Sequence, residues 1–77
     1  MPDNDERKDY TKPENRGELP RVGSFWKHRN GVTYAVTAIT NLPNSERYKT
    51  TVVYMNPSGA MWSRPLEDWH RSMTLQP

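Results

Sequence analysis

The dipeptide Asn30-Gly31 separates two segments that are rich in strand-forming residues. Asn-Gly is the pair that best tolerates positive φ at both centres of a two-residue type I′ turn, and the twist of that turn matches the twist of paired strands. Phe25-Trp26 precedes the turn, and residues 32–36 read Val-Thr-Tyr-Ala-Val after it. The sequence therefore predicts a β-hairpin over residues 24–40, around which the rest of the chain is arranged.

Two later segments extend this hairpin into a small antiparallel sheet. Residues 50–55 contain Val-Val-Tyr, and residues 60–64 contain Met-Trp. Between them, residues 56–59 read Asn-Pro-Ser-Gly, where proline suits an early turn position and glycine accepts positive φ at the end. We expect a third and a fourth strand joined by this turn, with a polar surface loop over residues 41–49. The alternation along the strands leaves open which sheet face is buried.

A short helix is predicted after the fourth strand. Pro65 cannot donate a ladder hydrogen bond, so the strand is expected to stop just before it. Leu66, Trp69 and Met73 follow at spacings of three and four residues and form one apolar stripe. This stripe is expected to close one open end of the sheet, and residues 74–77 are expected to fray.

Residues 1–21 differ in composition from the rest of the chain. They contain three prolines and dense mixed charge, with only Tyr10 and Leu19 as sizeable apolar side chains after Met1. Such a segment buries too little apolar surface to offset the entropy of ordering it. We expect a disordered charged leader ahead of a small β domain over residues 22–73. The alternative is an interaction arm that folds on a partner or covers the domain in an oligomer.

Length and composition limit the class of protein. A chain of 77 residues forms one domain with a thin core, which favours modest stability or self-association as a homodimer. The absence of cysteine excludes disulfides and thiolate metal sites. No apolar run approaches the roughly 20 residues of a membrane span, so we expect a cytoplasmic protein without a membrane partner. Residues 22–77 carry six basic and three acidic side chains, an excess that permits an anionic ligand without requiring nucleic acid.

Three blocks of residues occur in a fixed order. Residues 26–36 read Trp-Lys-His-Arg-Asn-Gly-Val-Thr-Tyr-Ala-Val, residues 52–54 read Val-Val-Tyr, and residues 59–66 read Gly-Ala-Met-Trp-Ser-Arg-Pro-Leu, with Trp69 after them. The chain resembles a small family of unknown function from bacteria and their phages, whose pattern is aromatic-x-His-x-x-Gly-x-x-Tyr-x-Val, Val-Val-Tyr and Gly-x-x-Trp-x-Arg-Pro. The residues of the first and third blocks are most similar to those of phage and prophage members. Three blocks in a fixed order are a more specific signal than any one block alone.

The resemblance implies a mainly β fold without established chemistry. The implied architecture is a small SH3-like, strongly bent antiparallel sheet or barrel of four to five strands with a short C-terminal helix. The match covers roughly residues 22–73. The cellular members carry a further histidine and acidic residues in the loop before Val-Val-Tyr, whereas residues 41–51 of this chain have no histidine and end in Arg47, Lys49 and threonines. No role of that loop is therefore carried over.

The presumed domain offers few groups for catalysis. Its acids are Glu46, Glu67 and Asp68, and the last two suit the start of a helix. His28 and His70 lie on different predicted elements, and a lone histidine on a strand is more often a hydrogen-bonded structural residue. No HExxH pattern or phosphate loop is present. We therefore expect no enzyme activity, catalytic residue, metal or cofactor.

Binding is better supported by the residue pattern. Trp62 and Arg64 share one strand face, and an aromatic ring beside a guanidinium suits a base and a phosphate. The structural alternative makes Trp62 a core side chain and pairs Arg64 with Glu67. Arg47 and Lys49 equally suit protection of an edge strand. The predicted ligand-binding residues are Lys27, His28, Arg29, Arg47, Lys49, Trp62 and Arg64.

Two main functional hypotheses follow. The first is a non-enzymatic phage or prophage accessory module that binds an anionic nucleotide-type ligand or a nucleic acid segment, and counters host defence by sequestering an immune signal. The alternative is an inhibitor or adaptor that docks a host defence protein through an edge strand or the leader. A hydrolase or nuclease that uses His28 or His70 is the third hypothesis.

Overall fold

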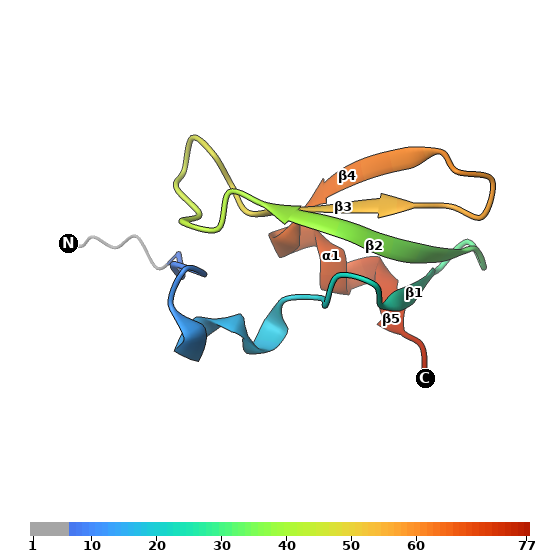
Figure 1. The fold of residues 1–77 in the computed structure, drawn as a ribbon, viewed down its shortest axis with the longest axis horizontal. Helices are drawn as coiled ribbons and strands as arrows, with labels where there is room; N and C mark the ends of the chain where they lie inside the picture. Colours follow the sequence, from blue (N-terminus) through green and yellow to red (C-terminus); the bar gives the residue numbers. More distant parts are fainter. Residues whose placement is uncertain (1–6) are drawn as a thin grey trace.

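The computed structural model describes residues 7–77, whose strands form one open antiparallel sheet wrapped around a short helix (Figure 1). The sheet order is β4-β3-β2-β1-β5. The elements are η1 (Pro13–Glu18), β1 (Phe25–His28), β2 (Thr33–Thr40), β3 (Thr51–Met55), β4 (Met61–Pro65), α1 (Leu66–Ser72) and β5 (Met73–Leu75). The prediction of a small, mainly β fold with a short C-terminal helix is confirmed. None of the helices in residues 7–77 is long and apolar enough to span a bilayer.

The hairpin between β1 and β2 forms as predicted, but its turn is not type I′. Gly31 has a φ of 93°, whereas Asn30 is not among the described residues with positive φ. The Gly31 N–H donates to the His28 carbonyl (2.8 Å), so Arg29 and Asn30 are the central residues of the turn. One extra residue in the connection lets glycine alone take the left-handed conformation. Arg29 consequently lies at the exposed tip of the hairpin.

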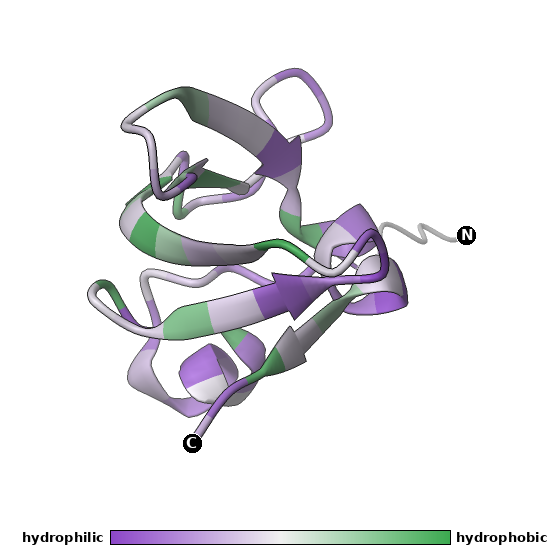
Figure 2. Cartoon of the chain, turned by 90° about the vertical axis from the view of Figure 1, so that its right-hand side faces the viewer, coloured by the Kyte–Doolittle hydropathy of each residue, from purple (hydrophilic) through white to green (hydrophobic). Residues whose placement is uncertain are grey.

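The sheet face that carries Trp26 is the buried one. Trp26 pairs with Tyr34, and Tyr54 pairs with both Val36 and Trp62, so these side chains share a face. Figure 2 shows the apolar residues concentrated in the strands, whereas the N-terminal segment and the connecting loops are mostly hydrophilic. The buried apolar core consists of Tyr10, Trp26, Val36, Val52, Tyr54, Leu66, Trp69 and Met73.

Trp69 is the centre of this core. Its side chain is 0% exposed and meets the rings of Trp26 and Tyr54 edge-on, at centroid distances of 5.6 and 5.1 Å. Leu66 and Met73 are buried beside it. The predicted apolar stripe is therefore buried, but only Leu66 and Trp69 belong to α1, since the helix ends at Ser72 and Met73 is the first residue of β5.

Pro65 is the last residue of β4, one residue later than predicted. It pairs with Thr51 of β3, and β4 lies at the edge of the sheet. A proline is tolerated there because an edge strand needs ladder hydrogen bonds on one side only. The Leu66 N–H then donates to the Thr50 carbonyl (2.9 Å), which starts α1 directly beside β3.

Residues 7–21 pack against the β domain, whereas the sequence predicted a disordered leader there. Tyr10 is 6% exposed within the core, and its backbone N–H donates to the Leu42 carbonyl (2.8 Å). The Asn44 side-chain amide donates to the Lys8 carbonyl (3.0 Å). A single buried tyrosine and several side-chain hydrogen bonds attach this segment to the β domain. The prediction missed this because the segment has no repeating apolar pattern. The rest of the expected leader, residues 1–6, lies outside the described residues.

The C-terminal residues also differ from the expectation of a frayed tail over residues 74–77. β5 pairs with β1, with Thr74 opposite Lys27 and Leu75 opposite Trp26. The Gln76 N–H donates to the Phe25 carbonyl (2.9 Å). Short terminal strands of this kind escape sequence patterns because their partner is far away in the chain.

Tyr10 is held by charged neighbours. Its hydroxyl donates to Oε2 of Glu18 (3.0 Å), which also accepts from Lys8 Nζ (3.0 Å). Burial and the hydrogen bond to Glu18 raise the pKa of Tyr10 to about 12. Burial alone would raise the pKa of Glu18, but the hydrogen bonds from Lys8 and Tyr10 outweigh it and leave that pKa lowered.

The pH dependence of folding tests this attachment. A tyrosine with a raised folded-state pKa contributes stability that is present below its ordinary value of 10.0 and is lost as pH rises toward about 12. In urea unfolding between pH 8 and 12, we expect the stability advantage of wild-type protein over Tyr10→Phe to shrink above pH 10. Parallel curves for the two proteins would contradict burial of the Tyr10 hydroxyl against Glu18.

Two tryptophans provide a matched test of the core. Trp69→Ala is expected to lower the free energy of unfolding by about 3–5 kcal/mol, because it empties the centre of the core. Trp62→Ala is expected to cost much less, since Trp62 is 46% exposed. Equal losses in urea unfolding would show that both side chains pack equally, contrary to this structure.

Candidate functional site

Three arginines from distant parts of the chain line one hollow of about 480 Å³. Arg64 comes from β4, Arg71 from the last turn of α1, and Arg29 from the turn after β1. We call this surface the arginine hollow. It is lined by Arg29, Ser63, Arg64, Pro65, Asp68, Arg71 and Ser72.

Ser72 joins two of these arginines. Its carbonyl accepts the Arg29 N–H (3.1 Å), and its buried hydroxyl accepts a hydrogen bond from Nη1 of Arg64. The second contact fixes one end of the Arg64 guanidinium and leaves other N–H donors of the group for a ligand. Ser72 therefore holds the backbone of Arg29 and the side chain of Arg64 in place.

The arginine hollow carries a positive charge. Asp68 is its one acidic lining residue, and Oδ1 of Asp68 lies 3.0 Å from Nη1 of Arg71. Within residues 7–77, neither Arg29 nor Arg64 has a carboxylate partner at ion-pair distance. The lining is therefore suited to an anion that accepts several hydrogen bonds, such as a phosphate.

Trp62 lies two residues before Arg64 on the same strand face. Its ring stacks on Tyr54 (centroid distance 6.3 Å, interplanar angle 30°) and meets Tyr34 edge-on (5.9 Å). It is nevertheless 46% exposed, on the edge strand β4. The alternative that Trp62 is a core residue is therefore wrong, and the expected Arg64 pairing with Glu67 is replaced by the contact with Ser72.

A second hollow, of about 440 Å³, adjoins the first. Lys27 of β1 and Thr74 of β5 are register partners, so their side chains stand together on it. His28 also lines it, and Nδ1 of His28 accepts the Asn30 N–H (3.0 Å). We call this surface the β1–β5 hollow. It is lined by Lys27, His28, Arg29, Gly31, Ser72, Thr74 and Gln76.

Arg47 and Lys49 line neither hollow. The Arg47 guanidinium carbon lies 5.5 Å from the ring centroid of its neighbour Tyr48. Lys49 Nζ lies 3.3 Å from Oε1 of Glu67. The structure thus separates these two predicted binding residues from Lys27, His28, Arg29, Trp62 and Arg64, because the loop that carries them lies at the other end of α1.

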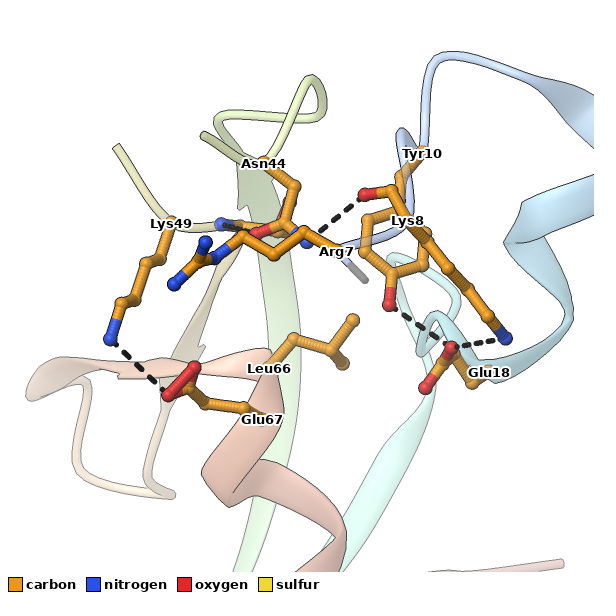
Figure 3. A pocket seen from close by; sticks show the side chains of 9 residues that line it. Arg7, Lys8, Tyr10, Glu18, Asn44, Lys49, Leu66 and Glu67 are labelled. Carbon is orange, nitrogen blue, oxygen red and sulfur yellow. Dashed lines mark hydrogen bonds and ion pairs between the residues drawn. The ribbon is translucent and has the colours of Figure 1, made fainter. Parts of the chain in front are cut away.

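Lys49 contributes to a third cavity, of about 350 Å³, between the N-terminal segment and the start of α1 (Figure 3). Its two lysines are each neutralised, Lys8 by Glu18 (3.0 Å) and Lys49 by Glu67 (3.3 Å). Leu66 forms part of the wall between these pairs. Arg7 also lines this cavity, which therefore has three cations and two carboxylates, against three cations and one carboxylate in the arginine hollow. The arginine hollow is thus the better suited of the two to an anion.

Arg71 is the cation of the arginine hollow that the sequence pattern missed. Its position near the end of a short helix is explained by the helix dipole alone. Its proximity to Arg29 depends on the pairing of β5 with β1, which brings residue 72 beside residue 29. No local sequence signal encodes that long-range contact.

The two histidines are held in separate environments. Nε2 of His70 lies 2.8 Å from the Glu18 carbonyl, and its ring meets Trp26 edge-on at 5.6 Å. His28 instead contacts Asn30 and Tyr34. Among residues 7–77, no group of three or more histidine, aspartate or glutamate residues is arranged to hold a metal ion.

No family model, curated protein or solved structure matches this chain. The family resemblance of the three sequence blocks stays a prediction.

Proposed function

We propose that this protein is a non-enzymatic binding module for a phosphorylated, nucleotide-type ligand. The observation that carries the proposal is the convergence of Arg29, Arg64 and Arg71 on one hollow, with exposed Trp62 beside Arg64. In this proposal the arginines bind phosphate and Trp62 stacks on the base. In a phage setting, such a module would counter host defence in the cytoplasm by sequestering a nucleotide-type immune signal.

The arginines suit phosphate for geometric reasons. A guanidinium presents a planar fork of donors that matches two phosphate oxygens at once. Arg64 is already oriented by Ser72, so less side-chain freedom is lost when a ligand binds. Asp68 moderates Arg71 without reaching the other two arginines, which keeps the hollow cationic.

Trp62 suits a base because one side of its ring is supported. Tyr54 stacks on it, and Tyr54 itself is 6% exposed. Stacking of a base on an aromatic side chain contributes about 1–3 kcal/mol and is tolerant of base identity. This arrangement supports a nucleotide over a simple inorganic anion.

Isothermal titration with ADP tests the proposal. We expect wild-type protein to bind ADP, and Arg64→Gln and Trp62→Ala each to weaken binding about tenfold, the scale of a charge-assisted hydrogen bond or one stacked base. Arg47→Gln is the matched control and is expected to bind like wild type. An equal loss in Arg47→Gln would indicate a general charge effect.

A salt series with a ten-residue oligothymidylate separates a nucleotide from a nucleic acid segment. Binding through several phosphates weakens steeply with salt because counterions are released. If neither ADP nor the oligonucleotide binds wild-type protein, the proposal is wrong, and docking of a host protein becomes the leading hypothesis.

A further inference from the structure

The arginine hollow and the β1–β5 hollow are two parts of one continuous surface. Both are lined by Arg29 and Ser72. The Arg29 N–H donates to the Ser72 carbonyl (3.1 Å), so this contact forms the boundary between the two hollows. Arg29 is exposed at the hairpin tip and lines both hollows.

The β1–β5 hollow is itself suited to an anion. Lys27 and Arg29 are its cations, and its lining includes no aspartate or glutamate from residues 7–77. The exposed Thr74 hydroxyl and the Gln76 amide add hydrogen-bonding groups. The Gln76 side chain is oriented by its hydrogen bond to the Thr74 carbonyl (2.8 Å).

We infer that the ligand carries two phosphate groups separated by a sugar, with one phosphate in the arginine hollow and the other in the β1–β5 hollow. The inference rests on the proposed function and specifies the class of ligand. Arg29 lies between the two phosphates and contacts both. This spacing occurs in a dinucleotide and in a single nucleic acid strand, which share the same sugar–phosphate chemistry.

A nucleoside diphosphate differs from such a ligand in a useful way. Its two phosphates are directly joined, so both stay in one hollow. Adenosine 3′,5′-bisphosphate has the same base and the same number of phosphates, but places them on opposite sides of the ribose. The pair therefore compares phosphate position, with about one more negative charge on the bisphosphate near neutral pH. The Lys27→Gln variant separates the effect of position from that of charge.

Isothermal titration of both compounds against four proteins tests the inference. Wild-type protein is expected to bind the bisphosphate about tenfold tighter than ADP. Lys27→Gln changes only the β1–β5 hollow. It is expected to weaken binding of the bisphosphate about fivefold and to leave binding of ADP unchanged. Arg71→Gln should weaken binding of both compounds, and Arg47→Gln should weaken binding of neither. All three substitutions are at exposed positions, and circular dichroism checks that each variant is folded.

The outcomes separate the inference from the proposed function. If ADP and the bisphosphate bind wild-type protein equally, the inference is wrong while the proposed function stands. A bisphosphate preference that persists in Lys27→Gln also overturns it, since the second phosphate then lies elsewhere. If neither compound binds and the ten-residue oligothymidylate does not bind either, the proposed function itself fails.

The source of the ligand is identified with thymidine oligonucleotides. A dinucleotide site is expected to bind 5′-phosphorylated dithymidylate as tightly as the ten-residue oligothymidylate. A strand-binding site is expected to bind the longer oligonucleotide more tightly and with a steeper salt dependence. Either result, with binding weakened in Lys27→Gln, supports two phosphate positions.

Discussion

The burial of Trp69 against the sheet is the contact on which the rest of this structure depends. α1 has only seven residues, and a helix of that length is not stable in isolation. Its position is therefore set by the side chains it buries, with Trp69 between the rings of Trp26 and Tyr54. β4 leads directly into α1 and β5 follows it directly, so this one packing contact also orients both edge strands.

The candidate site follows from the same arrangement. Arg64 precedes the helix, whereas Arg71 and Ser72 end it. A helix fixed on the sheet places these residues at a constant distance from each other and from the tip of the first hairpin. Trp26 and Trp69 are buried in the core, whereas Trp62 lies on the edge strand β4 and stays partly in solvent. The aromatic and the basic parts of the site are thus both positioned by β4 and α1.

Local patterns in the sequence predicted the parts of the fold that local interactions determine. The two hairpins depend on turn residues, and the burial of Leu66 and Trp69 depends on their spacing within α1. The turn type at Gly31 was not predictable, because the Asn-Gly pair fits both a two-residue turn and a connection that is one residue longer. Tyr10 was missed because a single anchor has no periodicity, and β5 because its pairing partner is remote.

The candidate site divides in the same way. Trp62 and Arg64 share a strand face by simple alternation, and Lys27, His28 and Arg29 are neighbours in sequence. Arg71 joins them only through the long-range pairing of β1 with β5. Arg47 and Lys49 were grouped with the site by charge alone. The charge of a residue does not tell where its loop lies in the fold, and this loop lies at the other end of α1 from the arginine hollow.

The pairing of β1 with β5 also has a consequence for folding order. Each of the hairpins β1–β2 and β3–β4 joins neighbouring strands through a short turn, whereas β1 and β5 are brought together from opposite ends of the domain. Contacts between remote residues carry the larger loop-closure entropy, so we expect this pair to form last and to open first. Both hollows meet at the Arg29 and Ser72 contact beside this pair, so they are complete only after the chain has closed. Hydrogen exchange of the Gln76 amide, which donates to Phe25, would report that closure directly, and slow exchange matching the core amides would show that β5 does not open independently.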